Sequence, residues 1–161
     1  MRSYSCPKNK DLQEFLHKQA IHFEKADITR TYLIVGEEGD IYAYFSLSTK
    51  EVIIDSDFLG VSKSAIKKMH LSDNNALRAF LIGQIGKNFA IPNNPLNLQL
   101  ILDEIYQLLY QAQQIIGSRA VILECENNPR LIQHYIKHDF KVIHVKSHHD
   151  GLITMYKFIT S

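Results

Sequence analysis

Residues 119–136 read RAVILECENNPRLIQHYI, and this stretch decides the fold. Residues 119–125 form a short, continuously apolar run that is typical of a strand buried on both faces. Asn127 and Asn128 follow, and Pro129 then stands where a first helical residue needs no N–H, so a helix begins here with an asparagine cap. The apolar stripe of that short helix is Leu131, Ile132, Tyr135 and Ile136.

A long helix is predicted upstream of this strand. Within residues 96–116, apolar side chains recur at spacings of three and four, and Gly117 suits the position after a helix end. Residues 76–85 are an apolar run that precedes the helix. The β–α–β unit over residues 76–125 should therefore pair its two strands in parallel, through a right-handed crossover.

The remaining segments complete one α/β domain. Residues 9–25 carry an apolar stripe and predict an amphipathic helix, with Leu12, Phe15, Leu16, Gln19 and Phe23 on one face. Residues 31–35 and 41–47 flank the turn-forming residues 36–40 and predict a β-hairpin. Residues 49–75 are less regular: 52–54 prolong or add a strand, and 62–68 are a short helix or a basic loop. Residues 140–145 and 153–158 predict two closing strands, so a mixed sheet within one domain over 1–161 is expected.

Composition excludes several classes of protein. Of 161 residues, 45% are hydrophobic, and Lys+Arg 18 against Asp+Glu 17 gives a net charge of +1, so the chain is neither disordered nor broadly basic. That charge argues against nucleic acid or an anionic membrane as a partner. No apolar run approaches the roughly 20 residues of a membrane span. Cys6, in an N-terminus expected to be frayed, and Cys125 form no C-x-x-C pair, which predicts a reduced, cytoplasmic protein.

The C-terminal half carries a recognisable pattern. Gly-Gln-Ile-Gly-Lys at 83–87, the long helix, Val-Ile-Leu-Glu-Cys at 121–125, Asn-Pro-Arg-Leu-Ile-Gln-His-Tyr at 128–135 and Asp-Phe at 139–140 resemble the GNAT family of acyl-CoA-dependent N-acyltransferases. The element order agrees over nearly the whole chain, and the motifs over about residues 80–145. The resemblance implies a mixed central sheet with a splayed parallel strand pair and flanking helices.

The resemblance also implies acetyl-CoA as the acyl donor. Its pantetheine arm would pair with the strand at Ile85, Gly86 and Lys87, and its pyrophosphate would rest on the loop that opens the long helix. The loop residues assigned this role are Asn93, Asn94, Leu96, Asn97 and Leu98.

This loop departs from the family pattern Q/R-x-x-G-x-G/A. Residues 92–97 read PNNPLN, which lacks both glycines, and Pro95 has no N–H to donate. Either the asparagines, which tolerate left-handed backbone, supply the contacts, or CoA binding is weakened or lost.

Two residues of the short helix match the family's functional positions. Tyr135 stands where the general acid that protonates the leaving thiolate is found, although it is also in phase with the core stripe. Asn128 caps the helix and, by the resemblance, also bonds the pantetheine. No general base is identified: Glu124, Asp55 and Asp57 are candidates, none at a diagnostic spacing.

Other reactive residues receive plainer interpretations. His134 and His138 are four residues apart, but no H-E-x-x-H motif is present, so no metal site is predicted there or at His148 and His149. Lys63, Lys67 and Lys68, the only basic cluster, fit a solvated helix face better than an RNA-facing edge. The apolar neighbours of Cys125 indicate an inert thiol, so acyl transfer would be direct, in a ternary complex.

The expected function is acetyl transfer from acetyl-CoA to a primary amine of a small molecule or peptide, with no metal, nucleic acid or membrane, and with a homodimer left open. One alternative is a catalytically impaired GNAT-like binding module, which the missing glycines favour. The other is a toxin that acetylates aminoacyl-tRNA.

Overall fold

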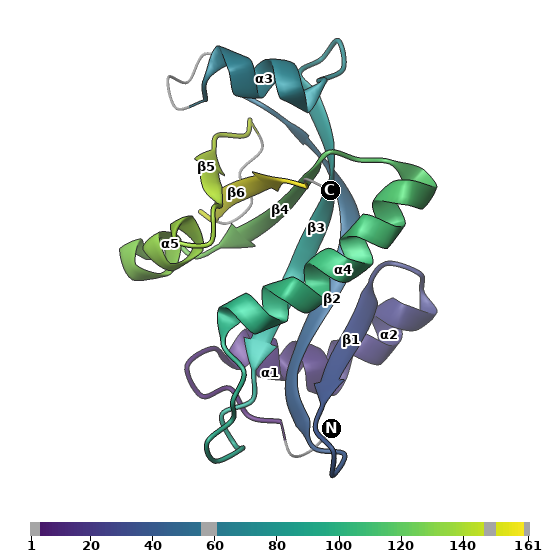
Figure 1. Ribbon diagram of the computed structural model, residues 1–161, viewed down its shortest axis with the longest axis vertical. Coiled ribbons are helices and arrows are strands. Elements are labelled where there is room, and N and C mark those ends of the chain that lie inside the picture. Colours follow the sequence, from purple (N-terminus) through teal and green to yellow (C-terminus); the bar gives the residue numbers. More distant parts are fainter. Residues whose placement is uncertain (1–3, 56–60, 147–150, 160–161) are drawn as a thin grey trace. The chain divides into compact units, whose positions relative to one another are not determined.

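The structure, a computed structural model, describes residues 4–55, 61–146 and 151–159 (Figure 1). In chain order its elements are α1 (Lys10–Glu14), the π-helical turn η1 (Phe15–Gln19), α2 (Ala20–Lys25), β1 (Arg30–Val35), β2 (Ile41–Ile53), α3 (Lys63–Met69), β3 (Ala76–Lys87), α4 (Leu98–Ile116), β4 (Ala120–Cys125), α5 (Pro129–Ile136), β5 (Lys141–Ile143) and β6 (Ile153–Phe158).

Six strands form one sheet in the order β1-β2-β3-β4-β6-β5. β1 and β2 are antiparallel, as are β4 and β6, and β5 and β6. β3 and β4, which α4 connects, are the parallel pair. The mixed sheet and its parallel pair, predicted from residues 76–125, are confirmed.

The chain forms two compact units that alternate along the sequence. Unit 1 comprises Met1–Ser48 and Ile82–Gln107, and unit 2 comprises Thr49–Leu81 and Leu108–Ser161. The chain passes from one to the other inside β2, inside β3 and inside α4, so no linker separates them. One domain over 1–161 stays a prediction.

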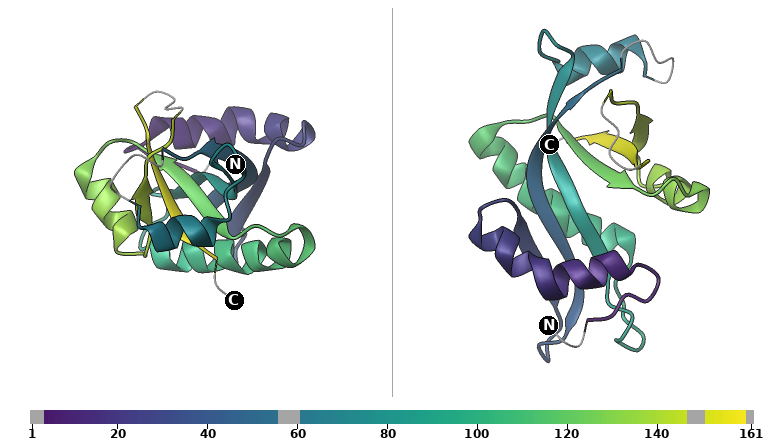
Figure 2. Two further views of the ribbon diagram at one scale, coloured as in Figure 1. Left: turned by 90° about the horizontal axis from the view of Figure 1, so that it is seen from above. Right: turned by 180° about the vertical axis from the view of Figure 1, so that it is seen from behind.

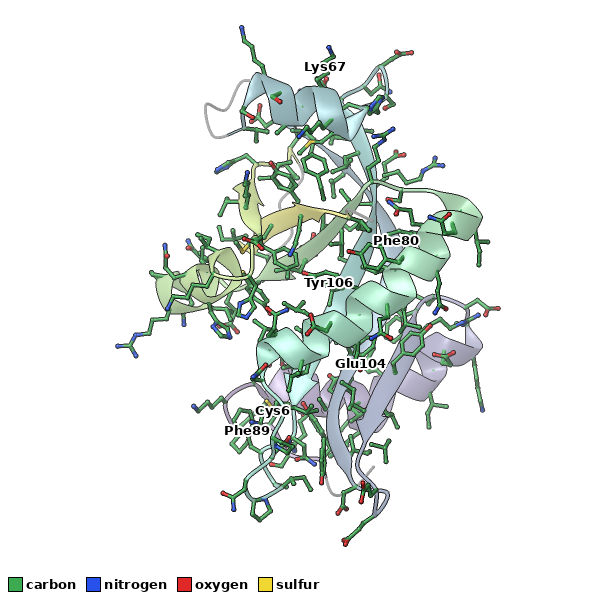
Figure 3. All side chains as sticks on the ribbon, in the orientation of Figure 1. Cys6, Lys67, Phe80, Phe89, Glu104 and Tyr106 are labelled. Atoms are coloured by element: carbon green, nitrogen blue, oxygen red, sulfur yellow. The ribbon has the colours of Figure 1, made fainter. Side chains whose placement is uncertain are left out.

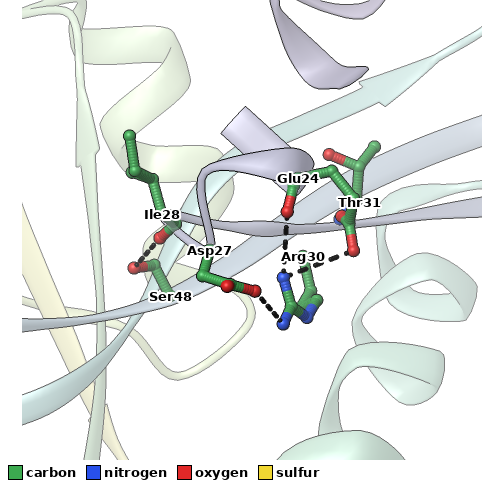
Figure 4. A network of polar contacts seen from close by, with 6 residues as sticks. All are labelled: Glu24, Asp27, Ile28, Arg30, Thr31 and Ser48. Carbon is green, nitrogen blue, oxygen red and sulfur yellow. Dashed lines mark hydrogen bonds and ion pairs between the residues drawn. The ribbon is translucent and has the colours of Figure 1, made fainter. Parts of the chain in front are cut away.

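Unit 1 contains the predicted hairpin. β1 and β2 pair with Tyr32 opposite Phe45, and those two rings stack with centroids 5.2 Å apart. In this unit, the segment α1–η1–α2 and the first part of α4 cover opposite faces of the strands (Figures 1 and 2). Where α2 leads into β1, Arg30 bonds Asp27 at 2.6 Å and Glu24 at 3.5 Å, and the Ser48 hydroxyl donates to the Ile28 carbonyl (Figure 4).

The predicted helix over 9–25 is real but not regular. The π turn at Phe15–Gln19 inserts one residue into the helical repeat and shifts the face that follows it. As a result Ala20 is buried, and Gln19, expected on the apolar stripe, is exposed.

The expectation of a frayed N-terminus is wrong from Tyr4 onward. Tyr4 and Cys6 are buried in a cluster with Phe15, Leu16 and Tyr44. The Ser5 carbonyl accepts a hydrogen bond from the Phe89 amide at 2.8 Å, and Figure 3 shows Cys6 and Phe89 at the same end of unit 1.

Gly86 owes its lack of a side chain to this cluster. A Cβ there would collide with the Tyr4 hydroxyl and would lie 3.3 Å from both Leu12 Cδ1 and Tyr44 Cε1. The Tyr4 and Tyr44 rings meet edge to face, with centroids 5.1 Å apart. Packing within unit 1 therefore requires glycine at this position.

Unit 2 has its own core, which includes Val52, Ile54, Leu77, Ile122 and Tyr156. The segment 62–68, left open between helix and loop, is helical: α3 spans Lys63–Met69, and Ser62 caps it by accepting from the Ala65 amide at 3.1 Å. The closing strand predicted over 140–145 is shorter, because only Lys141–Ile143 pair with β6 and Val145 instead bridges to Ile54.

The long helix begins two residues later than predicted, at Leu98, because Asn97 caps it. It ends as predicted: Gly117 has φ 75°, and its amide donates to the Gln113 carbonyl at 2.9 Å. Over the residues described, no helix is both long enough and apolar enough to cross a membrane.

Gly86→Ala should lower the free energy of unfolding by about 2 kcal/mol, because its methyl group displaces the Tyr4 ring from a filled core. Tyr4→Phe removes the colliding oxygen, so in urea denaturation the double variant should recover about 1 kcal/mol of that loss. Strict additivity of the two single variants would contradict this packing.

Candidate functional site

Asparagine side chains hold the turn between β3 and α4 in unit 1. Asn88 is fully buried (0% exposed). Its Oδ1 accepts from the amides of Ser5 and Ala90, both at 2.9 Å, and its Nδ2 donates to the Ile41 carbonyl at 2.8 Å. The turn is thus joined to the N-terminal segment and to the start of β2.

Asn94 fixes the second half of the same turn. Its Nδ2 donates to the carbonyls of Tyr42 at 2.8 Å and Asn88 at 3.0 Å, while its Oδ1 accepts from the Leu96 amide at 3.1 Å. Asn93 adopts the left-handed conformation, with φ 53°, that a glycine usually occupies. Asparagines therefore replace the missing glycines: Asn93 adopts the left-handed conformation, and the Asn94 side chain holds the turn.

The start of α4 keeps two donors available. Asn97 caps the helix, because its Oδ1 accepts from the Leu100 amide at 3.0 Å and its carbonyl accepts from the Ile101 amide at 3.2 Å. In the described chain the amides of Leu98 and Gln99 have no hydrogen-bond partner. The Leu96 amide, also expected to bind the cofactor, is already used by Asn94.

Lys87 brings a positive charge to this turn. Its Nζ donates to the Asn94 carbonyl at 2.9 Å. None of the described carboxylates lies within ion-pairing distance of it, so its charge is not neutralised by the protein. A helix N-terminus with free amides and a nearby ammonium group favours an anion such as a pyrophosphate.

Ile85 and Gly86 precede Lys87 in β3. Ile85 is half-buried. The glycine at 86 was expected to ease the approach of a ligand, but Tyr4 already gives a sufficient structural reason for it. Pantetheine pairing along Ile85, Gly86 and Lys87 stays a prediction.

Unit 2 carries Asn128 and Tyr135 on α5. Asn128 caps this helix, since its Oδ1 accepts from the Arg130 amide at 3.0 Å and its carbonyl accepts from the Ile132 amide at 2.9 Å. The capping role is confirmed; its predicted contact with pantetheine stays a prediction.

Tyr135 is buried, with 7% of its surface exposed. Its ring meets Phe140 edge to face, with centroids 5.9 Å apart. Burial, and secondly the nearby Cys125 thiol, raise the pKa of Tyr135 to about 12. The hydroxyl makes no hydrogen bond with a described residue, so it can still donate one to a ligand.

The raised pKa defines what this hydroxyl can do. A proton transfer from a phenol of pKa about 12 to a thiolate whose thiol has a pKa near 8.5 is uphill by roughly 5 kcal/mol. Tyr135 is therefore better suited to stabilising negative charge by a hydrogen bond than to full proton transfer.

Of the three candidate bases, Glu124 is engaged elsewhere: Lys50 Nζ donates to its Oε1 at 2.5 Å. Asp55 lies beside the bridge between Ile54 and Val145, and its amide donates to the His144 carbonyl at 2.9 Å. Asp57 lies outside the described residues, as do His148 and His149.

His134 and His138 are neighbours on α5, with ring centroids 5.2 Å apart, and His138 Nδ1 lies 2.8 Å from the His134 carbonyl. Burial, then the charges of His138 and Lys137, lower the pKa of His134. Among the described residues, no group of three or more His, Cys, Asp or Glu could hold a metal ion. The Cys125 thiol is buried, and burial followed by the Glu126 charge raises its pKa, which disfavours a nucleophile.

The predicted residues thus form one group in each unit. Lys87, Asn93, Asn94, Asn97 and Leu98 lie in one turn of unit 1, and Asn128 and Tyr135 lie on α5 of unit 2. A pocket of about 360 Å³ in unit 2, lined by Met69, Phe80, Arg119 and others, contains none of them.

The sequence-based prediction missed three residues: Asn88, Lys50 and Gln99, whose free amide lies one position beyond the predicted loop. Asn88 was not predicted, although a polar residue directly after a buried strand often indicates that the strand ends in a turn held by side-chain hydrogen bonds. Nothing in the sequence indicated that Lys50 pairs with Glu124, since 74 positions separate them.

Three solved structures illustrate what this fold is similar to. A tyrosine-to-phenylalanine mutant of KacT has a TM-score of 0.70 at 15% identity over 97% of this chain and 85% of that one. AtaT complexed with acetyl-methionyl-tRNAfMet has a TM-score of 0.70 at 15% identity, over 95% and 85%. AtaTR bound with acetyl-CoA has a TM-score of 0.64 at 11% identity, over 97% and 83%.

KacT and AtaT are toxins with the GNAT fold, and the present chain has that fold. No protein-family model matches the sequence, and no curated protein matches it. At these identities the likeness shows the fold alone.

The buried Tyr135 should make stability depend on alkaline pH. Its folded-state pKa lies above the unfolded value near 10. The neutral phenol therefore contributes fully to the stability of the fold below about pH 10, and this contribution is lost as the pH rises toward 12. As the pH rises from about 9.5 to 12, the free energy of unfolding of Tyr135→Phe should therefore fall by about 2 kcal/mol less than that of the wild type, as measured by urea denaturation. Parallel losses in the two proteins would show that this phenol titrates normally.

Proposed function

We propose that this protein is an acetyl-CoA-dependent N-acetyltransferase. The observation that carries the proposal is the turn before α4, where the GNAT fold coincides with two unpaired amides and the uncompensated charge of Lys87. The glycine-free sequence of this turn had raised the possibility of a binding module without activity. The asparagine network favours the enzyme over such a module, because the Asn94 side chain fixes the turn by hydrogen bonds without glycine.

The donor would be held by residues of the turn. The amides of Leu98 and Gln99 would donate to the pyrophosphate, and Lys87 would exchange its bond with the Asn94 carbonyl for one with a phosphate oxygen. Asn94 and Asn97 would position these donors and not contact the ligand through their side chains, which are already hydrogen-bonded.

The chemistry is transfer of an acetyl group from sulfur to nitrogen. The neutral amine attacks the thioester carbonyl carbon, a tetrahedral intermediate forms, and the C–S bond breaks as the amide forms. The amine nitrogen gives up one of its two protons to water and keeps the other as the amide N–H, and the CoA thiolate leaves. Tyr135, whose phenol is protonated at neutral pH and has a pKa raised to about 12 by burial, would donate a hydrogen bond to the negative charge on the leaving sulfur.

We infer that the acceptor amine belongs to an aminoacyl-tRNA. AtaT was solved with acetyl-methionyl-tRNAfMet, a molecule whose acetyl group sits on the aminoacyl nitrogen. This revises the sequence-based expectation of a small-molecule or peptide amine and of no nucleic-acid partner. That expectation rested on the net charge of the whole chain, +1, which says nothing of how charge is distributed.

Acetyl-CoA should raise the melting temperature of the protein, because it binds the native state. Lys87→Met should weaken its binding about tenfold, since one charge-assisted hydrogen bond is lost. Lys25→Met, which removes an exposed lysine of α2 in the same unit, is the matched control and should bind as the wild type does. No thermal shift at millimolar acetyl-CoA would refute the proposed activity.

Tyr135→Phe should lower kcat by about 100-fold while leaving the KM for acetyl-CoA nearly unchanged, because the hydroxyl acts mainly on the developing negative charge. The change removes one oxygen and keeps the ring contact with Phe140. Steady-state kinetics with aminoacyl-tRNA measure both constants, and full turnover by the variant would exclude Tyr135 from catalysis.

A further inference from the structure

The near-neutral chain divides into two units of opposite charge. Unit 2 contains 11 Lys and Arg (5 in Thr49–Leu81, 6 in Leu108–Ser161) and 8 Asp and Glu (4 in each segment), which gives +3. Unit 1 contains the remaining 7 and 9, which gives −2. Unit 2 also holds six of the eight histidines. A polyanion would therefore be drawn to unit 2.

Within unit 2, the exposed side of α5 is a cationic surface. Arg130, Gln133, His134 and Lys137 recur at helical spacing and are all exposed, whereas Tyr135 on the same helix is buried. With Pro129, these four residues line a shallow hollow of about 410 Å³. We call them the α5 surface. Its lining contains no acidic side chain.

Two of the carboxylates close to α5 along the chain are paired with lysines outside this surface. Asp139 pairs with Lys157 at 3.5 Å, and Glu124 pairs with Lys50 at 2.5 Å. Within the described residues, no carboxylate pairs with Arg130 or Lys137. The positive charges of this surface are therefore not compensated by the protein itself.

These charges also act on one another. The charges of His138 and Lys137, after partial burial, are what lower the pKa of His134. Crowding of like charges disfavours the protonated imidazole in the free protein, and an anion placed in the hollow would relieve it. Gln133 and His134 add neutral hydrogen-bond donors of the kind that contact phosphate and sugar oxygens.

We propose that the α5 surface docks the phosphodiester backbone of the acceptor RNA. This inference rests on the proposed function, because Tyr135 occupies the buried side of the same helix. One helix would then carry the hydroxyl that acts on the reaction and, one helix width away, the side chains that hold the substrate. The contacts are to phosphates and give affinity and orientation without reading the RNA sequence.

The double charge reversal Arg130→Glu with Lys137→Glu tests this surface. Binding of an unacylated tRNA, followed by fluorescence anisotropy without acetyl-CoA, should weaken at least about tenfold, and the dependence of log K on log salt should become shallower by about 2. The matched control is Lys63→Glu with Lys67→Glu on α3 of the same unit, where Figure 3 shows Lys67 pointing away from the helix. The control should change affinity by less than about threefold.

The outcomes separate this inference from the proposed activity. An unchanged thermal shift with acetyl-CoA shows that the α5 variant is folded and keeps its donor site. Equal losses in the α5 and α3 variants, or none in either, would overturn the α5 surface while leaving the activity standing. Polyglutamate that competes with tRNA at equal charge concentration would also overturn it, in favour of an acidic protein partner.

Discussion

The buried side chain of Asn88 is the constraint on which unit 1 depends. It accepts hydrogen bonds from Ser5 and Ala90 and donates to Ile41, so one amide joins the N-terminal segment, the turn after β3 and the start of β2. The Asn88 side chain is fully buried, and leaving one of its polar atoms unpaired would cost about 1–3 kcal/mol. Asn94 Nδ2 in turn donates to the Asn88 carbonyl, and the Asn94 carbonyl accepts from Lys87 Nζ. The network thus extends to the residues just before α4.

Much of the fold follows from local sequence, because its signals are local. The hairpin around Gly36–Asp40, the cap at Asn128 and the apolar run of β4 can each be recognised from a few consecutive residues. The π turn at Phe15–Gln19 could not be predicted, because no residue in it marks the extra position, and the error moved Gln19 onto the wrong face. The ordered N-terminus was missed for a different reason: its partners, Asn88 and Phe89, are more than 80 positions away.

The candidate site was only partly visible in the sequence. The family pattern pointed to the turn over residues 92–98 but gave no way to decide whether a turn without glycine could still expose amides. That depends on side-chain bonds from Asn94 and Asn97, which capture two amides and leave those of Leu98 and Gln99 unpaired. For Tyr135 a place in the core and the proposed role in catalysis are compatible, because the residue is buried while its hydroxyl makes no hydrogen bond with a described residue.

The turn before α4 is proposed to bind the diphosphate of acetyl-CoA through the free amides of the first turn of α4. Amide chemical shifts measured in a ¹⁵N-labelled protein during an acetyl-CoA titration test it most directly. If the turn binds the diphosphate in this way, the amides of Leu98 and Gln99 should shift the most in unit 1, and the Leu96 and Leu100 amides, already bonded to asparagines, should shift little. Saturable shifts that leave Leu98 and Gln99 unmoved, or no shifts at all, would contradict it.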